Sequence, residues 1–160
     1  MKLGEVIKKE REGKTGLNRH RQLTVEEVAE KLGVALDDWR AIEAGDSAVE
    51  KWFPILCQLA VKLQVPTSRL LAKSGKSKDT RVGQAAHLIR EHREERGKTI
   101  EEMAELMELT VDEYLPIEKG TSPIEKVGPL MLGFAELIEQ PVFNLYLPCG
   151  VLYQKLDDYP

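Results

Sequence analysis

With 160 residues, the chain is long enough for one domain or for two small ones. Its contents of hydrophobic (42%) and charged (31%) residues exclude a disordered or fibrous chain, and its net charge of −4 favours protein partners for the chain as a whole. No apolar run approaches the ~18 residues of a membrane span, and residues 1–9 lack the apolar stretch of a secretion signal. We therefore expect a cytoplasmic protein that does not cross a membrane.

The first predicted helix starts at Leu3 and leads into a basic stretch. This stretch contains Lys8, Lys9, Arg11, Lys14, Arg19, His20 and Arg21. Beside a phosphate backbone, such residues supply sequence-independent and salt-sensitive attraction. The lysines have a simpler alternative explanation as the solvated face of an amphipathic helix. The arginines of the following loop suit an arm that contacts the DNA backbone.

Thr24 predicts the start of a second helix, because Glu27 three residues later completes a capping box. A third helix is expected over residues 36–44. It should bury Trp39 and end at Gly45, since glycine tolerates the positive φ of a helix C-cap.

A fourth helix around residues 55–63 and a short fifth helix from residue 66 complete this series, which is then repeated. Residues 24–75 align without a gap on residues 99–150, and 17 of the 52 pairs are identical. A self-similar alignment of this length indicates two copies of one helical unit.

Upstream of Thr24 the same comparison favours an offset of 79, which pairs Arg11 with Arg90. The first copy would then carry four additional residues, within 15–22. Residues 73–79 are polar and suit a linker. The sequence therefore predicts two domains, residues 1–75 and residues 76–160.

The series of motifs resembles the Cro/cI-type (lambda-repressor-like, XRE) helix-turn-helix family. The segments that match are residues 3–5 with Arg11, then 23–29, 32–34, 42–45 and 59–65, and the second copy matches more weakly over 82–147. The resemblance implies an all-α fold of two tandem five-helix domains. It also implies that the third helix enters the major groove of DNA.

The resemblance and the basic stretch together give a set of candidate DNA-binding residues. They are Arg11, Lys14, Arg19, Arg21, Leu36, Asp37 and Arg40. Binders of this family usually carry amide or basic side chains on the third helix, which match base edges. Two successive carboxylates, Asp37 and Asp38, are unfavourable there, although acidic residues also stabilise the first turn of a helix.

The second copy departs further from the family pattern. Its third helix carries Asp112, Glu113 and Pro116 on the surface that would meet DNA. Residues 1–75 hold 13 basic and 11 acidic residues, a net of +2, whereas residues 76–160 hold 10 and 16, a net of −6. We therefore expect the second copy to serve assembly rather than base reading.

The end of the chain is richer in apolar side chains than the matching part of the first copy. The candidate interface residues are Val142, Phe143, Tyr146, Leu152 and Tyr153. An exposed apolar patch usually marks an interface, here for a homodimer or a protein partner through residues 76–160. The alternative is that this tail folds back and covers its own domain.

The leading hypothesis is a DNA-binding transcription regulator that contacts double-stranded DNA through the first copy. The rival hypothesis is a helix-turn-helix scaffold that binds proteins and not DNA. We expect no enzyme, because the sequence holds no phosphate loop, nucleophile elbow or metal triad. We expect no cofactor or metal, since Cys57 and Cys149 lack partners at ligand spacing and His87 and His92 fall on different helix faces.

Overall fold

A computed structural model describes residues 2–13, 22–147 and 157–160, and within these ranges every regular element is helical. The elements are α1 (Leu3–Glu12), α2 (Val25–Leu32), α3 (Leu36–Ala44), α4 (Val49–Leu63), η1 (Thr67–Leu70), η2 (Ser77–Asp79), α5 (Gln84–Glu95), α6 (Ile100–Leu106), α7 (Val111–Lys119), α8 (Ile124–Leu137) and η3 (Val142–Leu145), where η marks a 3-10 helix. The predicted all-α fold class is confirmed. Among these helices, none combines the length and the apolar character that a bilayer crossing requires.

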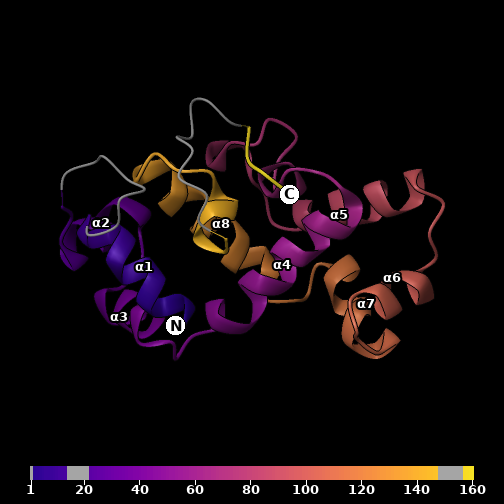
Figure 1. The fold of residues 1–160 in the computed structure, drawn as a ribbon, viewed down its shortest axis with the longest axis horizontal. Coiled ribbons are helices and arrows are strands. Elements are labelled where there is room, and N and C mark those ends of the chain that lie inside the picture. The colour runs from indigo at the N-terminus through magenta and orange to yellow at the C-terminus, as the bar shows by residue number, and fades with distance from the viewer. Residues whose placement is uncertain (1, 14–21, 148–156) are drawn as a thin grey trace.

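The two halves of the chain, residues 1–75 (the first half) and 76–160 (the second half), exchange their last helices. Figure 1 shows α1–α3 at one end of the molecule, α5–α7 at the other, and α4 and α8 between them. α8 packs on α2 of the first half as well as on α5 of its own half, and η3 packs on α1, whereas α4 and η1 pack on α5. Each set of three helices therefore also packs on a fourth helix from the other half of the chain.

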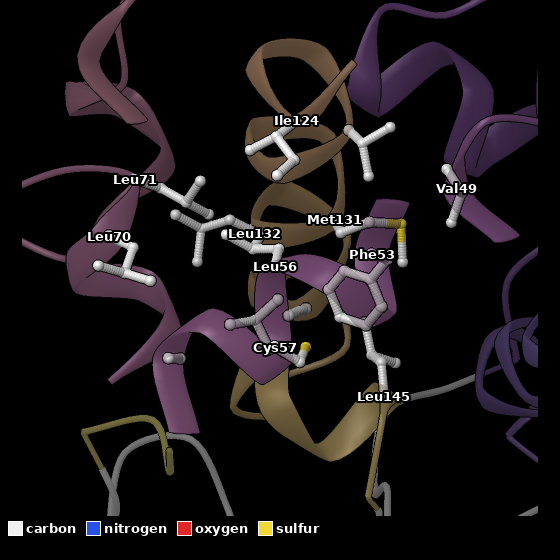
Figure 2. Close-up of a cluster of buried hydrophobic side chains, with 14 of the residues drawn as sticks. Val49, Phe53, Leu56, Cys57, Leu70, Leu71, Ile124, Met131, Leu132 and Leu145 are labelled. Atoms are coloured by element: carbon white, nitrogen blue, oxygen red, sulfur yellow. The ribbon is translucent and has the colours of Figure 1, made fainter. Parts of the chain in front are cut away.

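Side-chain contacts show the same exchange. The ring of Trp39 on α3 lies 4.9 Å from the ring of Phe134 on α8, and a Cβ on Gly133 would lie 3.3 Å from Leu32 on α2. The buried apolar residues of both halves form a single cluster. Figure 2 shows its centre, where α8 residues such as Met131 lie among side chains from α4 and η1. Residues 1–75 and 76–160 are thus repeats in sequence that share one core.

The local signals of the sequence appear in the structure. Thr24 and Thr99 form capping boxes with Glu27 and Glu102, and Gly45 ends α3 at a φ of 78°. Trp39 and its counterpart Tyr114 are fully buried, as predicted. α7 has a further capping box, between Thr110 and Glu113, which was not predicted from the sequence. The polar cap at each helix start satisfies backbone amides that would otherwise lack a partner.

The predicted pairing of Arg11 with Arg90 is wrong. Arg11 binds Glu43 and the Leu23 carbonyl, and Arg93 makes the equivalent bonds to Glu118 and the Lys98 carbonyl. The offset in the first helix is therefore 82, and the first half carries seven additional residues before α2 rather than four. Ile7 and Ile89 lie four residues before Arg11 and Arg93. Both isoleucines are buried, and they are related by the same offset of 82.

Replacing Gly4 with alanine is expected to lower the free energy of unfolding by about 1–3 kcal/mol. A Cβ at Gly4 would lie 2.5 Å from the backbone oxygen of Ile42, so α1 and α3 would have to separate. Gly133→Ala, whose Cβ would meet only the end of the Leu32 side chain, provides the control. Urea unfolding of both variants measures the difference; equal effects would contradict the close approach of α1 to α3.

Candidate interaction surfaces

The exposed face of α3 carries little free positive charge. Arg40 is its only basic residue, and the guanidinium lies 3.8 Å from both Glu26 on α2 and Asp37 on α3 itself. Asp37 is almost fully exposed, Asp38 is also exposed, and Leu36 is half-buried. A polyanion that approached this face would meet the exposed carboxylates of Asp37 and Asp38 and a single arginine that already has two carboxylate neighbours.

Arg11 is a buried structural residue rather than a surface cation. Its Nε and one terminal nitrogen donate to Glu43 at 2.5 and 3.0 Å, and its other terminal nitrogen donates to the Leu23 carbonyl at 2.8 Å. Trp39 Nε1 donates to the same Glu43 at 2.6 Å. Glu43 is the main cause that raises the pKa of Arg11. Because its donors are directed inward, we leave Arg11 out of any DNA-contacting surface.

The structure describes only some of the other basic residues in this part of the sequence. Lys8 and Lys9 are exposed on α1. Lys14, Arg19 and Arg21 lie outside the described residues, so their part in a DNA surface stays a prediction.

The exposed face of α6 and α7 in the second half is acidic. Its exposed carboxylates are Glu101, Glu102, Glu105, Glu108, Asp112 and Glu113. The capping bonds to Thr99 and Thr110 lower the pKa of Glu102 and of Glu113, which keeps both side chains charged at neutral pH. Pro116 lies inside α7, half-buried, without breaking the helix. This face offers repulsion to phosphate.

The predicted apolar interface at the chain end is not exposed. Val142 and Phe143 are buried, and Tyr146 is half-buried with its hydroxyl accepting from Gln58 Nε2 at 2.6 Å. These side chains belong to the shared core because η3 packs against α1 and α8. They present no patch to a partner, and they cover α1 of the first half as well as α8 of their own half. Leu152 and Tyr153 lie outside the described residues.

The carboxylate of Asp158 bridges the two halves of the chain at positions that correspond in the repeat. Its two carboxylate oxygens accept from the backbone amides of Ser68 at 2.7 Å and Phe143 at 2.9 Å, at the starts of η1 and η3. Ser68 and Phe143 are counterparts at the offset of 75. Burial raises the pKa of Asp158 to about 6, against the backbone amides that lower it.

This carboxylate should make stability depend on pH. Because its pKa is higher in the folded chain than the ordinary value of 3.8, the folded state binds more protons between about pH 4 and pH 6. The contribution of Asp158 to the free energy of unfolding should therefore rise as pH falls from 7 through 6. Urea unfolding at pH 7 and pH 5 measures it by comparison with Asp158→Asn; identical pH dependence in both proteins would contradict it.

A groove runs between α4 and the α6–α7 segment, where exchange brings the two halves together. It comprises two adjoining cavities that share Ile55, and their other apolar lining residues are Trp52, Pro54, Leu106, Met107, Leu109, Pro116 and Pro123. The Lys51 ammonium lies 5.1 Å from the centre of the Trp52 ring. The counterpart groove, between α8 and the α2–α3 segment, includes Lys31, Leu32, Val34 and Leu130.

The described residues contain no cluster of three or more side chains suited to hold a metal ion. No protein-family model, curated protein or solved structure matches the chain. The surfaces described above therefore carry the functional argument.

Proposed function

We propose that this protein is a helix-turn-helix-derived interaction module that acts through protein contacts and does not read DNA with α3 or α7. The observation that carries this proposal is the pairing of Arg40, the only base on α3, with Glu26 and Asp37. The acidic face of α6 and α7 supports it from the other end of the molecule.

Electrostatics supports the protein-contact hypothesis over the DNA-binding hypothesis. A protein that neutralises phosphates needs unpaired cations on the approaching surface, and each contact adds to a steep salt dependence. On the described helix-turn-helix faces of both halves, carboxylates outnumber basic side chains. Contacts with another protein have no such requirement and tolerate an acidic surface.

An anisotropy titration with a labelled random duplex tests the proposal. We expect no saturable binding at ~50 mM salt and no change on Arg40→Ala. Binding at ~50 mM salt that is lost by ~200 mM and weakened by Arg40→Ala would overturn the proposal.

A DNA-binding regulator is the second candidate function. Two observations favour it: Lys8 and Lys9 are exposed on α1, and α3 and α7 lie along the same edge of the molecule in Figure 1. Two recognition helices on one side are what a protein that spans two half-sites requires. In this case Lys8→Ala with Lys9→Ala should weaken duplex binding about equally for all sequences.

A further inference from the structure

We propose that residues 69–81, which join the two halves of the chain, form a basic surface that binds an acidic segment of a partner protein. This inference rests on the proposed function, since it names a surface and a class of protein partner. The basic side chains of this surface are Arg69, Lys73, Lys76, Lys78 and Arg81. All of them except the half-buried Arg69 are exposed, and Asp79 is the only acidic residue in the same range.

The backbone of this basic surface is fixed on α8. The amide and the hydroxyl of Ser77 both donate to the Glu136 carboxylate, the amide at 2.9 Å. The Arg81 guanidinium donates to the Lys78 carbonyl at 3.1 Å, which keeps these two bases next to each other. A partner therefore has little conformational entropy to remove from the segment when it binds.

The ammonium groups of the surface have no acidic partner within the chain. Lys73, Lys76 and Lys78 form no ion pair with a described carboxylate, whereas Arg69 pairs with Asp157. The residues outside the described ranges include no Asp or Glu. The two acidic side chains that contact the segment otherwise, Asp79 and Glu136, are half-buried and accept hydrogen bonds from serines of the same segment.

The end of the chain shows that acidic residues fit beside this surface. Arg69 donates to the Asp157 carboxylate at 2.9 Å, and the next residue, Asp158, accepts from the Ser68 amide at 2.7 Å. Two successive acidic residues thus lie against η1. When Asp157 and the two half-buried carboxylates are counted, five bases face three acids. The surface therefore keeps a net positive charge that the chain does not neutralise.

Folding of the repeated unit does not require this charge. At the offset of 75, Arg69 and Lys73 correspond to Asn144 and Pro148 in the second half. Asn144 is buried in η3, the counterpart of η1, without a positive charge. Exposed lysines with no ion pair, on a chain with a net charge of −4, suit a partner of complementary charge.

An acidic protein segment suits the surface better than a nucleic-acid backbone. Double-stranded DNA carries one charge per ~1.7 Å along a stiff helix, so phosphates at the lysines would also approach Asp79 and Asp157. A peptide can place its carboxylates at the lysines alone. The observed contact of Arg69 with Asp157 is also a peptide carboxylate contact.

The probe is a labelled peptide of about 12 residues in which Glu alternates with Ser, and its Gln/Ser counterpart is the reference. The full-length chain is titrated into each peptide at ~50 mM salt, and anisotropy is measured. The test variant carries Lys73→Gln, Lys76→Gln and Lys78→Gln. The matched control carries Lys2→Gln, Lys8→Gln and Lys9→Gln, which removes the same charge from three exposed lysines of the first half.

We expect saturable binding of the Glu/Ser peptide and at least tenfold weaker binding of the Gln/Ser peptide. The test variant should lose a factor of about ten or more in affinity, and the control should stay within about twofold of the native chain. Circular dichroism should show unchanged helix content in both variants, because none of the six lysines is buried.

Equal binding of the two peptides, an unchanged affinity in the test variant, or an equal loss in the control would overturn the assignment of this surface. Absence of peptide binding would overturn it as well, while the proposed function would still stand if duplex DNA also fails to bind. Duplex binding that disappears in the test variant and is insensitive to Arg40→Ala would show a nucleic-acid surface and overturn the inference. Duplex binding that is weakened by Arg40→Ala would overturn the proposed function.

Discussion

Residues 1–75 and residues 76–160, prepared as separate polypeptides, should each lack a cooperative unfolding transition, and an equimolar mixture should recover the helix content of the intact chain. The reason is the exchange, because α1–α3 without α8 and η3 lose the partners of Trp39 and Leu32. α5 likewise loses α4 and η1. A unit of about 75 residues that lacks part of its core falls below the burial that small domains need.

Circular dichroism and thermal unfolding measure this effect on each half and on the mixture. Each half alone, at the total chain concentration of the mixture, is the control, since it lacks the helices that the other half supplies. Cooperative unfolding of residues 1–75 alone, at the temperature of the intact protein, would contradict the expectation.

The second large effect is expected for Glu118→Ala, which should lower the free energy of unfolding by about 3–5 kcal/mol. Glu118 pairs with Arg93 at 2.7 Å, and both side chains are less than a tenth exposed. It also accepts from the Tyr114 hydroxyl. Removing it leaves a buried guanidinium charge and a buried hydroxyl without their acceptor. The pKa of Tyr114, raised by burial and by this carboxylate, should fall when Glu118 is removed.

Urea unfolding quantifies the loss, and exposed Asp112→Asn on the same helix is the control. The double variant Arg93→Met with Glu118→Leu should recover much of the stability, because it leaves no buried charge unpaired. A single variant that unfolds like the native chain would show that this ion pair contributes no net stability.

The sequence predicted the helices because their signals are local. The capping boxes at Thr24 and Thr99 and the glycine at the end of α3 depend only on residues within one or two turns. The repeat at an offset of 75 likewise predicted that Trp39 and Tyr114 occupy equivalent buried positions.

The exchange could not be predicted in this way. Phe134 on α8 and Leu59 on α4 are counterparts, and both are fully buried apolar residues. The hydrophobic pattern would allow either residue to pack on Trp39. Periodicity therefore does not show which half of the chain supplies the side chain that contacts this ring. The choice depends on the path of the chain after Gly45 and Gly120, which is a tertiary property.

Two errors in the candidate site have physical causes. Arginines stand at two offsets from Arg11, Arg90 at 79 and Arg93 at 82. Arg93 is the structural counterpart, because it binds Glu118 as Arg11 binds Glu43. The apolar residues of η3 look surplus for a closed five-helix unit, but exchange gives them α1 to cover. The spacing from Ile7 to Arg11, repeated from Ile89 to Arg93, was the signal that could have corrected the offset.

The exchange of α4 and α8 is the central claim, since the groove and the shared core depend on it. Nuclear Overhauser contacts from the Trp39 indole in the intact 160-residue chain test it most directly. The account predicts contacts to the Phe134 ring, whose centre lies 4.9 Å away. Contacts to the methyl groups of Leu59, with none to Phe134, would show that each half keeps its own fourth helix and would contradict the account.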